Sequence, residues 1–95
     1  MDTRKPIANP VVVIRKEYDD WAVLFNPDNG EAVGINPVGV AIWEILTGNN
    51  TITDIAGHIE QGFTDVPGAA DQEIKTFIDD LIQGGFVGLE ASSSD

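Results

Sequence analysis

Apolar residues cluster in short strand-like runs in the first third of the chain and recur at helical spacing in the rest. Residues 11–14 are β-branched, and residues 22–25 are apolar and of strand length. Asn29-Gly30 is a dipeptide that tolerates the positive φ angles of a hairpin turn, so residues 31–35 are expected to return as an antiparallel partner. The pattern predicts three consecutive strands with short connections, which most simply form an antiparallel meander.

Two amphipathic helices are predicted to follow these strands. Asn36 is suited to cap the first helix, Pro37 fits its first turn, where a missing N–H costs nothing, and Gly48 is expected to end it. The second helix is expected to begin at Thr51, which has Asp54 at the spacing of a capping box, and to end near Gly62. The apolar positions of each helix recur every three or four residues, so each helix buries a single face.

A third helix, over residues 71–83, has the most regular pattern. Gly84-Gly85 is expected to end it, and the apolar segment 86–89 to lie on the core as a small wing or tail. Three strands, three helices and this apolar return describe an α+β domain like a winged helix-turn-helix, with a three-stranded antiparallel sheet followed by three helices. The apolar stripe of the third helix consists of Ile74, Phe77, Ile78, Leu81 and Ile82.

The distribution of apolar residues indicates one domain with polar ends. Residues 1–9 have little apolar content and are expected to form a flexible N-terminal arm. Residues 10–89 contain all of the periodic segments, whereas residues 90–95 have nothing to bury and are expected to be a disordered tail. A chain of 95 residues is large enough for a single small core.

The charge balance narrows the classes of partner. Sixteen acidic residues against five basic ones give a formal net charge of −11, which opposes binding to nucleic acid or to an anionic membrane surface. Winged helices often bind DNA, but the predicted helix 71–83 carries Lys75 as its only basic residue among four acidic ones. No nucleic-acid partner is expected, and the acidic surface either attracts a basic partner or simply maintains solubility.

The cysteine content limits the chemistry that the protein can perform, and the hydropathy limits its location in the cell. The chain has no cysteine, which excludes disulfides, thiolate catalysis and thiolate metal sites. No apolar run approaches the roughly 20 residues of a membrane span, and the N-terminal segment lacks the apolar stretch of a signal peptide. The expected location is therefore cytoplasmic, with no membrane partner.

Candidates for catalysis or metal binding are few. His58 lies four residues after Asp54, on the same helical face, but two ligands do not make a zinc site and no nucleophile is suitably placed. Asp79 and Asp80 are adjacent, so they point in different directions from a helix, and a solvated face explains them better than acid-base chemistry. The sequence predicts no enzyme, no metal site and no cofactor.

Binding through the backbone is the function that the pattern favours. A meander leaves strand 31–35 or strand 11–17 at an edge, with N–H and C=O groups that another extended chain can pair with. Gly34 lies inside the first of these strands, where glycine marks either the close approach of another backbone or a bulge or twist of the strand. Peptide addition to residues 31–35 is one hypothesis. The alternative is a structural or regulatory interaction module that forms homodimers through the edge strand at residues 11–14.

Four features follow one another in a fixed order along the chain: the hairpin around Asn29-Gly30, the segment GINPVGVAIW at 34–43, Leu46-Thr47-Gly48, and Thr51 with Asp54-Ile55. This order resembles the PqqD family of pyrroloquinoline quinone biosynthesis, whose relatives serve as recognition elements for ribosomally synthesised and modified peptides. The likeness covers roughly residues 10–88. It implies a peptide chaperone that binds the leader region of a ribosomal precursor peptide and presents it to a modifying enzyme, often a radical S-adenosylmethionine enzyme.

The resemblance also implies where the peptide binds. In related modules the leader adds as a strand to the third strand of the sheet and lies against the third helix. Ile74, Phe77 and Leu81 should face the core, and the sequence leaves open which flank of helix 71–83 lines the groove. On a helical wheel, four residues lie to one side of these three core positions and are predicted as side-chain contacts. The predicted peptide-binding residues are Ala32, Val33, Gly34 and Ile35 on the strand, and Lys75, Ile78, Asp79 and Ile82 on the helix.

Overall fold

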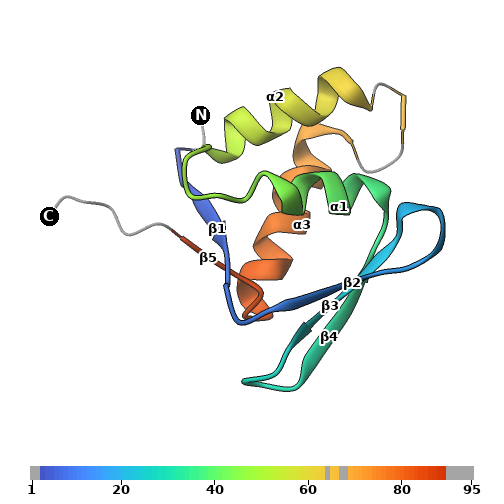
Figure 1. The fold of residues 1–95 in the computed structure, drawn as a ribbon. Helices are drawn as coiled ribbons and strands as arrows, with labels where there is room; N and C mark the ends of the chain where they lie inside the picture. Colours follow the sequence, from blue (N-terminus) through green and yellow to red (C-terminus); the bar gives the residue numbers. More distant parts are fainter. Residues whose placement is uncertain (1–2, 64, 67–68, 90–95) are drawn as a thin grey trace, which may run out of the picture.

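The computed structural model describes residues 3–63, 65–66 and 69–89, and Figure 1 shows their arrangement. Within these ranges, three strands form one antiparallel sheet, three helices follow, and the two ends of the described chain pair as a second, two-stranded sheet. The predicted α+β class, with a three-stranded sheet followed by three helices, is therefore confirmed.

The main sheet consists of β2 (Val13–Lys16), β3 (Ala22–Asn26) and β4 (Glu31–Ile35), in that spatial order. A short 3-10 turn, η1 (Tyr18–Asp20), joins β2 to β3. The hairpin between β3 and β4 is tight because Gly30 adopts a φ of 76° and its N–H donates to the Asn26 carbonyl at 2.8 Å. The predicted meander is confirmed.

Side chains of this sheet alternate between a buried and an open face. Ala22, Leu24 and Ile35 are at most 2% exposed and form the floor of the core. On the other face, Phe25 is 42% exposed and Val13, its partner across the strands, is 56% exposed. The period of two in the sequence thus becomes a sheet with one face in the core.

Capping side chains fix the helix starts at the predicted residues. The Asn36 side chain accepts from Gly39 N–H at 2.8 Å at the start of α1 (Pro37–Glu44). Thr51 and Asp54 form the reciprocal capping box of α2 (Ile52–Gly62). The third helix, α3 (Asp71–Gln83), has the predicted bounds. However, α1 ends at Glu44, before the expected stop at Gly48, because the chain leaves the helix at Ile45.

The N-terminal segment differs from the prediction of a flexible arm. Pro6–Ala8 form β1, which pairs antiparallel with β5 (Val87–Leu89). Ala8 N–H also donates to the Leu46 carbonyl at 2.9 Å, and Ile52 N–H donates to the Arg4 carbonyl at 3.0 Å. The prediction is wrong for this strand because its partners are distant in sequence. Residues 1–2 and the predicted tail at 90–95 lie outside the described residues.

None of the helices in the described ranges is long and apolar enough to cross a membrane.

One hydrophobic core joins the sheet to the helices. The least exposed large side chains come from β3, β4, α1, α2 and α3, with Pro6 of β1, and they are Leu24, Ile35, Ile42, Ile52, Ile55, Ile74, Ile78 and Pro6.

Candidate functional site

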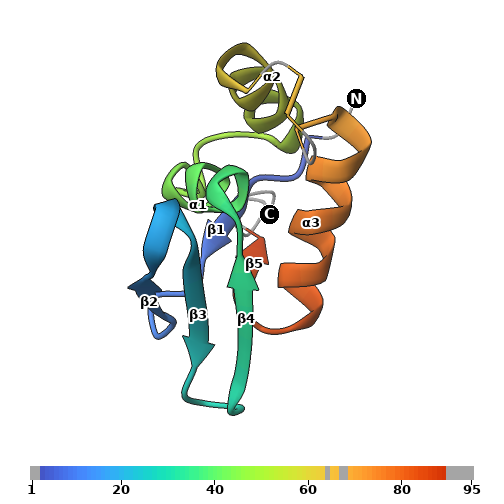
Figure 2. The same ribbon diagram turned by 90° about the vertical axis from the view of Figure 1, so that its right-hand side faces the viewer.

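Strand β4 has an unpaired edge. It pairs with β3 on one side, and no other described strand pairs with its second side. Figure 2 shows β4 as the outer strand of the sheet, on the side where α3 runs. Alternate residues of an edge strand point their N–H and C=O groups away from the sheet. The edge of β4 therefore presents a row of backbone donors and acceptors beside α3.

Gly34 leaves the outer face of β4 without a side chain at this position. The exposed backbone at Gly34 has no heavy atom within 4 Å of the position that a Cβ would occupy. The pairing of β4 with β3 runs without interruption from Glu31 to Ile35, with Gly34 opposite Val23. A bulge is thus excluded as the reason for this glycine, which leaves the twist of the strand and the close approach of another backbone as the two interpretations.

The predicted strand residues differ in what they offer to a partner. Ala32 is exposed and Val33 is half-buried, so both side chains are accessible in part. Ile35 is only 2% exposed because it points into the core. The side chain of Ile35 is therefore unavailable, and this residue has only its backbone to offer.

Phe77 is the aromatic side chain of α3 that lies toward β4. A Cβ placed on Gly39 would lie 3.0 Å from Phe77 Cζ and 3.0 Å from Ile35 Cβ, so the ring sits where β4 meets α1. The ring is half-buried. Phe77 was predicted as a core residue, but it forms the rim of the core on the side of the open edge.

The other end of α3 is tied to the hairpin by asparagine side chains. Asn26 Nδ2 donates to the Gly85 carbonyl at 2.8 Å, and Asn29 Nδ2 donates to the Gly84 carbonyl at 3.1 Å. Asn9 Nδ2 donates to the same Gly85 carbonyl at 3.0 Å. Because these carbonyls follow the last turn of α3, the amides of Asn26 and Asn29 hold the β3–β4 hairpin to the end of α3, and the Asn9 amide holds the segment after β1 to the same place.

The predicted helix contacts lie mainly on the other flank of α3. Asp79 forms an ion pair with Arg4 at 3.1 Å, so its flank faces the segment that leads into β1. Lys75 and Ile82 share this flank because they are four residues before and three residues after Asp79. Ile78 is 0% exposed, so the prediction that its side chain lines a peptide site is wrong. The centre of the buried stripe is Ile78 rather than Phe77.

His58 and Asp54 have structural surroundings. Asp54 Oδ2 accepts from Thr51 N–H at 3.1 Å as part of the helix cap. His58 is exposed and lines a small cavity of about 120 Å³ with Asp54, Ile45 and Asn50. Among the described residues, no group of three or more His, Asp or Glu side chains is placed to hold a metal ion. The arrangement provides a helix cap and no recognisable catalytic constellation.

Sequence comparison assigns the chain to a family. The family model described as Coenzyme PQQ synthesis protein D (PqqD) matches residues 22–87. The chain belongs to the PqqD family. Because the match begins at β3 and ends within β5, this PqqD-family region contains the open strand β4, the helix α3 and the asparagines of the hairpin.

A solved structure shares the fold of this PqqD-family protein. TbiB1, in complex with the TbiA(beta) leader peptide, superposes with a TM-score of 0.67 at 22% sequence identity. The superposition covers 93% of this chain and 99% of the TbiB1 chain. At this identity the likeness shows a common fold. No curated protein matches the chain.

Sequence reasoning missed the asparagines, although one signal was present. Asn26 lies two residues after Leu24 and four after Ala22 in β3. Because every second residue of a strand points to the same face, Asn26 lies on the buried face of the sheet. A buried amide needs hydrogen-bond partners, so a polar residue at such a position indicates a tertiary contact. The choice between the two flanks of α3 had no comparable signal, because a helical wheel does not show which neighbour lies on which side.

Proposed function

We propose that this PqqD-family protein is a non-catalytic adaptor that binds the leader region of a ribosomal precursor peptide by strand addition to β4. The observation that carries the proposal is the unpaired edge of β4, opened at Gly34 and placed beside α3. The fold shared with TbiB1, whose structure contains a leader peptide, supports it. The adaptor then presents the peptide to a modifying enzyme in the cytoplasm, and the family resemblance favours a radical S-adenosylmethionine enzyme.

Backbone pairing supplies part of the binding free energy. Alternation along the five residues of β4 leaves roughly half of their N–H and C=O groups for a partner, or about five hydrogen bonds. At about 0.5–1.5 kcal/mol net for each bond, these give roughly 2.5–7.5 kcal/mol before the cost of ordering the peptide. Micromolar affinity needs about 8 kcal/mol. Side-chain contacts must supply the remainder.

Those contacts come from the groups that flank the edge. Every second side chain of an added strand points toward the inner face of the sheet, where Val33 and the Phe77 ring are half-buried. Apolar side chains at these positions would complete the burial of both groups. On the outer face, Ala32 and Gly34 leave room for larger peptide side chains.

Two proline variants test strand addition. Because hydrogen bonds alternate, one of Val33 and Gly34 donates its N–H to β3 and the other directs its N–H away from the sheet. Of the variants Val33→Pro and Gly34→Pro, one is expected to lower the melting temperature, and the other to stay folded and lose peptide binding. Binding is measured by fluorescence anisotropy with peptides selected on the full-length protein from a displayed random library. Unchanged affinity in the variant that stays folded would rule out the mode.

Self-association through β2 is the second candidate function. On its free side, β2 has no strand partner among the described residues, and Val13 is 56% exposed. A dimer formed there would leave β4 free, so the two functions are compatible. Light scattering after size exclusion separates them: a monomer at micromolar concentration that still binds peptide contradicts self-association and supports the adaptor.

A further inference from the structure

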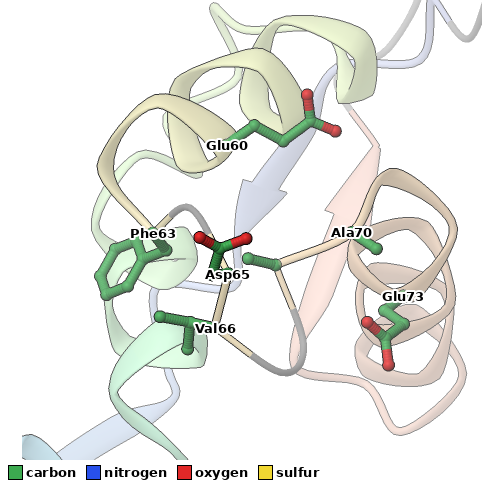
Figure 3. A pocket seen from close by; sticks show the side chains of 7 residues that line it. Glu60, Phe63, Asp65, Val66, Ala70 and Glu73 are labelled. Atoms are coloured by element: carbon green, nitrogen blue, oxygen red, sulfur yellow. The ribbon is translucent and has the colours of Figure 1, made fainter.

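A pocket lies between the C-terminal end of α2 and the N-terminal end of α3 (Figure 3). It has a volume of about 300 Å³, and none of the predicted peptide contacts lines it. Its apolar wall includes Phe63, Val66 and Ala69, whereas Glu60, Asp65 and Glu73 contribute three carboxylates. The three acidic residues come from α2, from the connecting loop and from α3.

The lining selects the chemistry of an occupant. Carboxylates on a protein of net charge −11 repel anions and attract cations. A bare metal ion does not fit, because no set of His, Asp or Glu side chains in the described ranges is arranged to ligate one. Arginine and lysine combine an aliphatic stem, which would pack on Phe63 and Val66, with a cationic head that reaches the carboxylates.

The position of the pocket relates it to β4. Glu73 lies four residues before Phe77, so both are on one flank of α3 and about 6 Å apart along its axis. Phe77 marks the level at which β4 ends, because its ring lies beside Ile35 and Gly39. An extended peptide advances about 3.3 Å per residue, so it covers this distance in about two residues. A peptide that continues past the end of β4 along α3 would therefore reach the level of Glu73, one of the residues that line the pocket, in about two residues.

We propose that this pocket receives an arginine or lysine side chain of the bound leader peptide, about two residues outside the segment paired with β4. The inference rests on the proposed function and adds the class of side chain that the leader carries there. Backbone pairing with β4 alone accepts any extended peptide. The pocket adds selectivity for peptides that carry a basic side chain at a fixed distance from the paired segment.

The test uses peptides selected from the displayed random library on the full-length protein. Hydrogen exchange identifies the peptide segment that pairs with β4, and a basic residue is expected to be enriched at one position outside it. Replacing that residue by its neutral analogue, citrulline for arginine or norleucine for lysine, should weaken binding about tenfold. The double variant Glu60→Gln/Glu73→Gln should bind the parent peptide more weakly than the natural protein by a similar factor. Its affinity for the neutral peptide should equal that of the natural protein.

A matched variant removes two charges elsewhere. Glu17 and Glu44 form ion pairs with Arg15 and Lys16. The double variant Glu17→Gln/Glu44→Gln should leave the affinities for the parent and the neutral peptide unchanged within twofold. The pocket assignment is overturned if both double variants weaken peptide binding equally, or if the selected peptides show no enrichment of a basic residue outside the paired segment. The proline variants would still test strand addition in that case. If the proline variants bind normally, or if no peptide is selected, the proposed function fails and the pocket assignment with it.

Discussion

The amide of Asn26 is expected to hold the hairpin to α3, and its replacement tests this directly. Asn26 is 3% exposed, its Nδ2 donates to the Gly85 carbonyl at 2.8 Å, and its Oδ1 accepts from Asp28 N–H at 2.8 Å. Asn26→Ala removes both bonds. The Gly85 carbonyl keeps the Asn9 amide at 3.0 Å, and the N–H of the exposed turn residue Asp28 loses its side-chain partner. At about 0.5–1.5 kcal/mol per bond, the free energy of unfolding should fall by about 1–3 kcal/mol.

Asn26→Asp is the more informative variant because it changes few atoms. The introduced carboxylate still accepts from Asp28 N–H, but it directs a negative charge at the Gly85 carbonyl in place of a donor. Burying this charge without a cationic partner costs more than losing the amide, so Asn26→Asp should be less stable than Asn26→Ala at pH 7.

The effect of pH on Asn26→Asp has a definite sign. Burial raises the folded-state pKa of the introduced carboxyl above its unfolded value, so the folded state binds more protons. Stability relative to the natural protein should therefore recover as the pH falls through that raised pKa and be lost again as the pH rises. Protonation also restores a donor toward the Gly85 carbonyl.

Urea denaturation followed by tryptophan fluorescence at pH 7 and pH 4.5 measures these differences, with the natural protein and Asn26→Ala as references at each pH. The reference proteins remove the contribution of the other acidic residues. The reasoning is refuted if Asn26→Asp is as stable as the natural protein at pH 7, or if its deficit relative to Asn26→Ala is the same at both pH values.

Three further substitutions test the surroundings of β4. Thr51→Ala removes the capping box of α2 and should lower the free energy of unfolding by about 1 kcal/mol, measured by urea denaturation. Gly39→Ala places a Cβ 3.0 Å from Ile35 Cβ and Phe77 Cζ and should cost about 1–3 kcal/mol; an unchanged midpoint would contradict the close packing. Phe77→Leu should keep the fold and weaken selected peptides about three- to tenfold in anisotropy titrations, and equal affinity would remove the ring from the site.

Local signals in the sequence were sufficient to predict most of the elements. Asn36 and Thr51 cap the helices as expected, because an N-cap depends on residues that are three positions away along the chain. The hairpin at Gly30 and the bounds of α3 follow from equally short-range preferences. Such features need no knowledge of the rest of the fold.

The features that could not be predicted depend on contacts between distant residues. Strand β1 has three residues and pairs with β5, more than 70 positions later, so its own sequence gives no strand signal. The orientation of α3 about its axis likewise depends on residues that are distant in sequence. The stripe showed that one face is buried, but only the Arg4–Asp79 ion pair and the contact of Phe77 near Gly39 show which flank faces which neighbour.

The side chains of the two outer strands favour β4 over β2 as the strand to which a peptide is proposed to add. Strand β2 carries Arg15 and Lys16, which pair with Glu17 and Glu44, and charged residues on an edge oppose the addition of another strand. Strand β4 has its single charge at Glu31, next to the turn, and has no side chain at Gly34. A partner strand thus meets desolvation and displacement of ion pairs at β2, and open space at β4. The charged side chains thus favour β4 over β2 as the edge that receives a partner strand, and β4 is the edge beside α3 (Figure 2).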